Sequence, residues 1–341
     1  MKRRTFIKVV GVTTGSALFV PNILTNVYSA SDEPLDDKEL PKRPLGKTGL
    51  KISTAAFSGF ALNKYEQSEC NIGVKRAFDR GVNYFDVAPA YGESENRMGI
   101  ALQGIDRSKY YLACKTKMRD AKGAMEELER SLKRLKTDHF DVYQLHHLRK
   151  PEEVQQALGP GGAMEAILKA KEQGKVRFIG FSAHTTKAAL EAMKQFKFDT
   201  VMFPISFVEY YRFDFGKAVL EEAKKQGLGV LAIKAMSTGL WQRGEKPTRN
   251  WWYRSAENQD EVNLVTRFSL SFDHVSAIFA PSFLDLVDKA ITAAKQFRPI
   301  TDEERNKLKE WAQKCDSLFK REEDQVTFFN LQKNSFYTPY C

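Results

Sequence analysis

Hydrophobic residues along the chain fall into short apolar runs that alternate with longer stretches of helical periodicity. Runs such as VYQL, VRFIGF and VLAI are apolar almost throughout, which is typical of strands buried on both faces. A hairpin is predicted at PLGKTGLKIS, and a final helix at about 302–320 opens with the capping sequence Thr301-Asp302-Glu303-Glu304. The pattern predicts strands at 53–58, 82–86, 110–115, 140–145, 176–181, 199–203, 228–233 and 275–279, and helices at 67–80, 93–103, 121–136, 162–174, 185–196, 213–226, 257–270 and 283–296.

Strands that alternate with helices in this way predict an α/β fold, a (β/α)8 TIM barrel with an N-terminal hairpin and an extra C-terminal helix. The alternative is a doubly wound open sheet. That fold would place a GxGxxG turn after its first strand, and AAFSGFAL matches this motif poorly. In a barrel, functional side chains lie at the carboxyl ends of the strands, so those ends are where chemistry is expected.

The first thirty residues, MKRRTFIKVVGVTTGSALFVPNILTNVYSA, differ in character from the rest of the chain. A paired arginine, an apolar middle and small residues near the end predict a twin-arginine export signal. A membrane anchor or a disordered tail is the alternative, but the apolar run is too short and interrupted to span a bilayer. We therefore expect a signal at 1–30, a linker at 31–42 and one barrel domain at 43–341. This division implies the twin-arginine machinery as a partner and a periplasmic or otherwise exported location, with no stable membrane anchor.

Charge and cysteine content narrow the function classes. The chain has 53 Lys and Arg against 43 Asp and Glu, and residues 1–30 hold four of the basic residues and no acidic one, so the remainder carries a net charge of +6. Acids are interleaved with the bases, as on solvated helix faces, which argues against nucleic acid as a partner. The cysteines at 70, 114, 315 and 341 have no metal-ligand spacing, so no metal site is expected, and their pairing stays open.

Four ionisable side chains lie at three consecutive predicted strand ends. Asp86 ends the second strand, Tyr91 follows in the next loop, Lys115 ends the third strand and His146 ends the fourth. A nearby ammonium lowers the pKa of a phenol, and a carboxylate keeps that ammonium charged. Tyr91 could then exchange a proton with a carbonyl or alcohol oxygen while His146 donates a hydrogen bond to it. None of these groups carries hydride, so the chemistry requires a nicotinamide cofactor.

Each of the four also has an ordinary structural interpretation: a turn-capping acid, a packed aromatic ring, a solvated lysine and a core histidine. Strand alternation should turn only one of His146 and His147 into the mouth of the barrel. The same alternation turns Cys114 away from the mouth, so we expect it in the core. It is the coincidence of all four at successive strand ends that favours a site.

These segments resemble the aldo-keto reductase superfamily from Arg43 to about residue 296. GVNYFDVAPAYGESE is similar to the family signature around its Asp and Tyr, CKTK to its lysine strand, FDVYQLHH to its histidine strand and VRFIGFS to its fifth strand. The resemblance implies a (β/α)8 barrel, NAD(P)(H) as cofactor, and Asp86, Tyr91, Lys115 and His146 as a catalytic tetrad.

The cofactor half departs further from the family pattern. Ala183 stands where the family has Asn, with His184 beyond it, able either to reach the cofactor loop or to cap a helix. Ile233 replaces a stacking aromatic, and no basic residue follows the eighth strand before Lys289. Both NAD and NADP therefore stay open, with NADP favoured weakly by family habit. The resemblance assigns to the cofactor Gly59, Ser182, Met202 (where the family has Gln), Lys234 and Ser282.

A long aromatic segment, LWQRGEKPTRNWWYRS, follows the seventh strand. Phe60, Trp241, Trp251 and Trp252 are the residues we expect at the substrate, since flat aromatic surfaces suit sugar rings or aromatic aldehydes. A loop that packs its own aromatics is the alternative. The tail NSFYTPYC could also close over the mouth.

The function predicted from these features is an NAD(P)(H)-dependent oxidoreductase that interconverts a carbonyl, in an aldehyde, ketone or sugar, with an alcohol. Two alternatives remain. One is an exported sugar epimerase or lyase that holds its cofactor tightly and uses it within one turnover. The other is a non-catalytic binding protein built on the same barrel.

Overall fold

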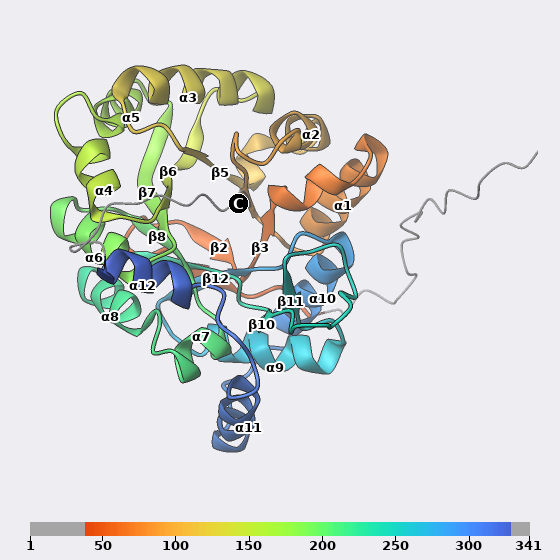
Figure 1. Cartoon of the computed structure of the whole chain (residues 1–341). Helices are drawn as coiled ribbons and strands as arrows, with labels where there is room; N and C mark the ends of the chain where they lie inside the picture. Colours follow the sequence, from red (N-terminus) through yellow and green to blue (C-terminus); the bar gives the residue numbers. More distant parts are fainter. Residues whose placement is uncertain (1–37, 329–341) are drawn as a thin grey trace, which may run out of the picture. The chain divides into compact units, whose positions relative to one another are not determined.

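A computed structural model of the protein describes residues 38–328. The predicted export signal and the tail NSFYTPYC lie outside this range. Within it, eight parallel strands close into a barrel in the order β12-β3-β4-β5-β6-β7-β8-β9, which confirms the predicted fold class (Figure 1). The barrel strands are β3 (Ala55–Ser58), β4 (Tyr84–Asp86), β5 (Tyr111–Thr116), β6 (Phe140–Leu148), β7 (Val176–Ala183), β8 (Thr200–Pro204), β9 (Gly229–Ile233) and β12 (Val275–Phe279).

Helices form the outer layer of the barrel (Figure 1). Several begin at the side-chain caps that their sequences supply: Thr185, Asn258 and Thr301 each accept a hydrogen bond from a first-turn amide. The helices within the predicted ranges are α1 (Gln67–Asp79), α2 (Ser94–Ala101), α3 (Ala121–Leu135), α5 (Ala163–Glu172), α6 (Thr186–Gln195), α8 (Lys217–Gln226), α9 (Gln259–Leu270), α10 (Leu284–Lys295) and α11 (Asp302–Ala312).

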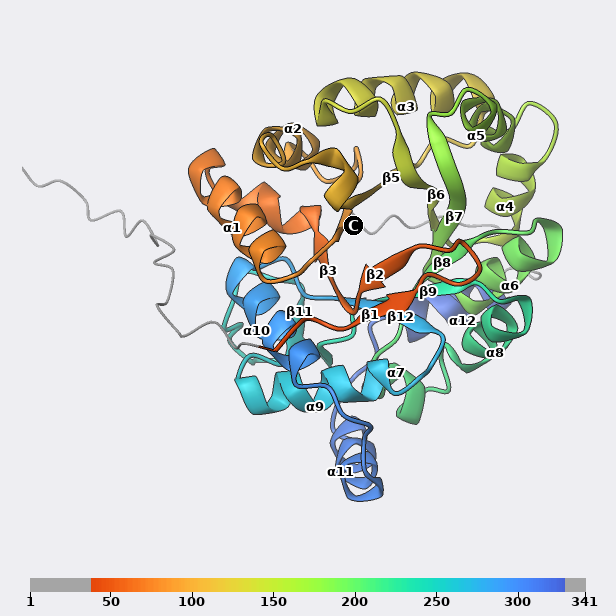
Figure 2. The same ribbon diagram turned by 180° about the vertical axis from the view of Figure 1, so that it is seen from behind.

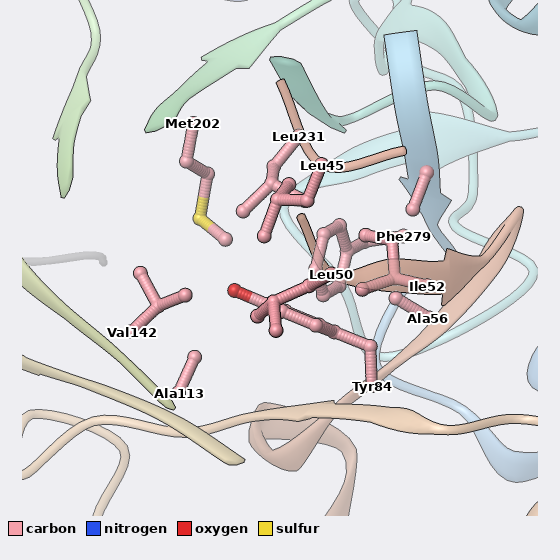
Figure 3. Packing of buried hydrophobic residues seen from close by; sticks show 11 residues of the cluster. Leu45, Leu50, Ile52, Ala56, Tyr84, Ala113, Val142, Met202, Leu231 and Phe279 are labelled. Carbon is pink, nitrogen blue, oxygen red and sulfur yellow. The ribbon is translucent and has the colours of Figure 1, made fainter. Parts of the chain in front are cut away.

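The predicted N-terminal hairpin closes one end of the barrel. Strands β1 (Lys42–Pro44) and β2 (Lys51–Ser53) pair antiparallel and lie across the end seen in Figure 2. Leu45 and Leu50, together with Ile52, join the core inside the barrel (Figure 3). Burial of each such side chain stabilises the fold by about 1.5–3 kcal/mol, so the hairpin is a structural part of the barrel.

The hairpin approaches the barrel so closely that one position must be glycine. Gly46 has φ +53, and a Cβ there would lie 2.3 Å from the backbone nitrogen of Gly229 at the start of β9. No side chain fits that gap without displacing backbone.

Four elements go beyond the prediction. They are α4 (Pro151–Leu158), the short α7 (Phe207–Arg212), α12 (Lys320–Phe328) and a hairpin made of β10 (Ser237–Leu240) and β11 (Tyr253–Ser255) in the aromatic segment. The final helix was predicted to run to about 320 but ends at Ala312. The residues after it bond elsewhere: the carbonyl of Asp316 accepts from the amide of Leu240, and Ser317 and Leu318 donate to Glu209. Among residues 38–328 no helix has the length and apolar character needed to cross a bilayer.

Candidate active site

The carboxyl ends of β4, β5 and β6 bring the four predicted catalytic side chains into one cluster. Lys115 Nζ donates to Asp86 Oδ2 and to the carbonyl of Val87, the latter at 3.2 Å. The same nitrogen lies 5.0 Å from the centre of the Tyr91 ring. The His146 ring meets the Tyr91 ring edge-on, with centroids 5.5 Å apart. Three adjacent parallel strands thus present an acid, an amine, a phenol and an imidazole to one space.

The Asp86 and Lys115 side chains form a buried ion pair, with 2% and 0% exposure. Burial raises the pKa of Asp86, and the neighbouring ammonium opposes this rise. Burial also acts to lower the pKa of Lys115, but Asp86 and Tyr91 outweigh it and the pKa is raised overall. Lys115 therefore stays charged at neutral pH, and its charge is directed at the Tyr91 ring.

Burial, with a smaller contribution from Lys115, lowers the pKa of His146 well below its usual value, so this ring is neutral. Its Nδ1 is buried and meets no hydrogen-bond partner among the described residues. Arg119, in the loop after β5, donates to the carbonyls of His146 at 2.8 Å and His147 at 3.4 Å, which fixes the end of β6. A neutral imidazole with one ring N–H can donate to a substrate oxygen without competing with Tyr91 as an acid.

The strand alternation on which the expectation for His146 and His147 rested is interrupted at this point of β6. The register of β6 against β7 shifts between Leu145 and Leu148, and His147 has φ +60. This irregularity breaks the alternation of side chains and leaves the two imidazoles near one another, with centroids 6.2 Å apart. Cys114, by contrast, is buried and its sulfur contacts Glu95 on α2, so its predicted core position is confirmed.

The residues assigned to the cofactor each have structural contacts within the barrel. Ser182 Oγ accepts from the amide of His147 at 2.7 Å. Met202 packs in the barrel core (Figure 3), and Gly59 is required by packing, because a Cβ there would lie 2.9 Å from the Val87 side chain. Lys234, at φ +59 after β9, is half-buried, and Ser282 is buried just before α10.

A row of aromatic rings extends from the tyrosine across the mouth. The ring centroids of Tyr91 and Phe60 lie 4.8 Å apart, those of Phe60 and Trp251 lie 5.5 Å apart, and Trp251 reaches Phe283 at 5.9 Å. Trp241 Nε1 donates to the carbonyl of Trp251 at 2.7 Å. Of the four predicted substrate residues, Phe60 thus contacts the tyrosine directly, Trp251 is connected to it through Phe60, and Trp241 donates to the backbone of Trp251.

Trp252 has a different environment. Its ring packs edge-on against Tyr253, and Lys234 Nζ lies 5.3 Å from the centres of both rings. This part of the segment packs its own aromatics, as in the alternative interpretation. The sequence prediction missed the roles of Arg119 and of Lys64, whose Nζ lies 4.9 Å from the Trp251 ring. The position of Arg119 in the loop after a strand that ends in a site lysine is the signal that could have revealed it.

Comparison with known proteins agrees with this geometry. A family model described as the aldo/keto reductase family matches residues 52–314. L-galactose dehydrogenase of Arabidopsis thaliana is 28% identical over 213 residues, which is 58% of this chain and 66% of the plant enzyme. An aldo-keto reductase of Bacillus subtilis is 30% identical over 218 residues, covering 58% of this chain and 62% of that protein. The chain thus spans a little under two thirds of the length of these relatives.

A solved structure supports the fold independently. The holo form of an aldo-keto reductase from Bacillus halodurans superimposes with a TM-score of 0.67. The alignment covers 84% of this chain and 100% of that one, at 21% sequence identity.

Proposed function

We propose that this chain, which belongs to the aldo/keto reductase family, is an oxidoreductase that interconverts a carbonyl and an alcohol with NAD(P)(H), using Tyr91 as general acid and base. The observation that carries the proposal is the cluster itself. Lys115, Asp86 and His146 reach the tyrosine from three adjacent strand ends. Accidental placement would not give a buried cation, its counter-ion and a neutral imidazole around one phenol.

The proposed role of Tyr91 is to give its hydroxyl proton to the substrate oxygen in reduction and to take it back in oxidation. The ammonium 5.0 Å from its ring stabilises the negative charge left on the phenol oxygen. His146, neutral, donates a hydrogen bond that orients the same substrate oxygen. Asp86 acts through Lys115, whose charge it keeps in place in a fully buried environment.

A nicotinamide dinucleotide, when bound, would supply or accept the hydride that no side chain here can carry. The residues present fit such a group in two respects. Lys234 offers a cation at the end of β9. The N-cap residue of α10 makes no side-chain cap hydrogen bond, and among the described residues the amide of Leu284 donates only to the Tyr65 hydroxyl at 3.3 Å, a bond that a phosphate oxygen could replace. Arg249 is bound by Asp285 at 2.9 and 2.6 Å and is therefore not free to bind a 2′-phosphate. We accordingly propose that the chain binds either NAD(H) or NADP(H). The only argument for preferring NADP(H) is its usual use in the family.

For the substrate we propose a sugar or an aromatic carbonyl. The row of rings from Tyr91 through Phe60 to Trp251 offers flat apolar faces beside the proton donor, which suit the C–H faces of a sugar ring or an aromatic aldehyde. The similarity to a plant enzyme named L-galactose dehydrogenase supports the sugar class.

The test uses two tyrosines of the same barrel. Purified protein without residues 1–30 is titrated with NADH and NADPH by fluorescence, and turnover is measured with sugars and aromatic aldehydes. Tyr91→Phe should bind the dinucleotide unchanged and lose at least a hundredfold in kcat. Tyr84→Phe is the matched control, because its hydroxyl lies in the barrel core and it should keep full kcat (Figure 3). Full turnover by Tyr91→Phe would refute the mechanism, and no binding of either dinucleotide would favour the binding-protein alternative.

We also propose that the chain is exported folded, with its cofactor loaded before export, as the paired Arg3-Arg4 suggests. A tightly held cofactor would also allow an epimerase-type cycle in which a sugar is oxidised and re-reduced in one turnover. Protein recovered from the periplasm should carry one dinucleotide, seen by mass spectrometry, and Lys in place of both arginines should keep the protein inside the cell. Export that is indifferent to this change would refute the signal assignment, and periplasmic protein that holds no dinucleotide would refute loading before export.

A further inference from the structure

Three metal-ligating side chains that the tetrad does not use gather beside it. His147 lies near the end of β6, His184 follows β7, and Glu322 is on α12. One ligand atom from each lies within 4.8 Å of the other two. Figure 1 shows how this is possible, since α12 lies at the end of the barrel where β6 and β7 finish.

We propose that His147, His184 and Glu322 bind a divalent transition-metal ion of the zinc type. Two imidazoles and one carboxylate form the protein ligand set of many catalytic zinc sites, and they leave a position for water or a substrate oxygen. This departs from the expectation of no metal site, which rested on cysteine spacing. The histidines and the glutamate are too far apart in the sequence to form a recognisable motif.

Both histidines are held in place by the backbone. His147 adopts φ +60, a conformation that L-residues rarely take, and its amide donates to Ser182 Oγ. The amide of His184 donates to the carbonyl of Leu148 at 3.0 Å. The two rings meet edge-on with centroids 4.1 Å apart. The register irregularity in β6 thus includes strained backbone at His147, a position where a ligand function would explain the strain.

The carboxylate comes from a helix that is tied to the same region. Arg149 Nε lies 3.5 Å from one oxygen of Glu322, so the other oxygen is available to an ion while the arginine orients the group. The next residue, Glu323, accepts from the amide of Thr186 at 2.8 Å, which joins α12 to the start of α6. Phe319, just before α12, packs against the His184 ring at 5.3 Å.

Binding requires only a local adjustment. A tetrahedral ion with bonds of about 2.0–2.1 Å holds its ligand atoms about 3.4 Å apart. The ligand atoms here lie within 4.8 Å of one another, so they must approach by up to about 1.4 Å. Glu322 can supply most of this movement because it is only half-buried and lies on a surface helix.

The electrostatic surroundings limit the affinity. Four cationic side chains lie near His147: Lys117, Arg149, Arg119 and Lys234. The same cations repel a divalent ion, so we expect a dissociation constant on the order of micromolar rather than nanomolar.

The test measures binding, not turnover. Untagged protein without residues 1–30 is stripped with a chelator and titrated with ZnCl2 by calorimetry and with CoCl2 by visible absorption. We expect one Zn2+ per chain and a Co2+ spectrum of low coordination number. Glu322→Gln should weaken Zn2+ binding at least tenfold, and His147→Asn, which keeps a residue tolerant of positive φ, should abolish it.

Controls separate this site from adventitious binding. His139→Asn removes a surface histidine that pairs with Asp138, and Glu310→Gln removes an exposed carboxylate on α11; both should bind Zn2+ as the parent does. Near-ultraviolet circular dichroism confirms that each variant is folded. The proposal is overturned if the parent binds less than 0.1 equivalent, or if folded Glu322→Gln and His147→Asn bind as tightly as the parent.

Discussion

A single buried carboxyl group ties the C-terminal segment to the barrel, and its titration should be measurable. Glu209, on α7, is 1% exposed. Its two oxygens accept from Ser317 Oγ at 2.5 Å and from the amide of Leu318 at 2.6 Å. Burial raises the pKa of Glu209 from 4.5 to about 7, although both hydrogen bonds oppose the rise. The folded protein therefore holds a proton on this group at pH values where the unfolded chain has released it.

The sign and size of the effect follow from proton linkage. Because the pKa is higher in the folded state, this group stabilises the fold most below pH 4.5, and the contribution is lost as pH rises to about 7. One pKa unit corresponds to about 1.4 kcal/mol, so the full shift is worth about 3 kcal/mol, of which about 2.5 kcal/mol is lost between pH 5 and pH 8. Glu209→Gln cannot ionise, and its amide can still accept from Leu318 and donate to Ser317.

The assay is urea unfolding followed by tryptophan fluorescence at pH 5, 6, 7 and 8. Relative to the parent, Glu209→Gln should gain about 2.5 kcal/mol in unfolding free energy from pH 5 to pH 8, whatever its offset at pH 5. Glu310→Gln, which removes an exposed carboxylate on α11, should show no such slope. A difference between parent and Glu209→Gln that changes by less than about 0.5 kcal/mol from pH 5 to pH 8 would show that this carboxyl does not titrate as its burial requires.

Three further substitutions, with Gly49→Ala as a control, test the packing and the buried ion pair of the barrel. Tyr84→Phe should raise the unfolding free energy by about 1 kcal/mol, because the buried hydroxyl of Tyr84 has no hydrogen-bond partner among the described residues. A lower unfolding free energy of the variant in urea would contradict this. Asp86→Asn should destabilise by about 3–5 kcal/mol, because it leaves the Lys115 ammonium buried without its counter-ion; an unchanged urea midpoint would show that the pair does not hold that charge. Gly46→Ala should lower the unfolding free energy by about 3–4 kcal/mol. Gly49→Ala, whose Cβ would meet nothing within 4 Å, should lower it by about 1 kcal/mol. Equal decreases would mean that the hairpin does not pack tightly against β9.

The barrel and the tetrad could be predicted because both depend on local pattern. Each barrel strand is a short apolar run, and Asp86, Lys115 and His146 are found simply by locating where those runs end. The unpredicted α4 also has a local signal, with Pro151 in its first turn and Gly159 at its end.

The rest depends on contacts between distant segments. The final helix stops at Ala312 because the following residues bond to Glu209 and to β10, neither of which its own sequence reveals. The approach of His147 to His184 depends on a register shift in β6, and Glu322 joins them only because α12 lies over that end of the barrel. Periodicity predicts elements, but it does not predict a bulge or the place where a terminal helix docks.

The hairpin covers the far end of the barrel (Figure 2) and packs Leu45 and Leu50 into its core. Any molecule that binds at Tyr91 must therefore enter and leave at the opposite end of the barrel, where the strands finish. The molecule that binds deepest must then bind first and dissociate last. Turnover would follow a fixed order of binding and release because leucine side chains close the other end of the barrel.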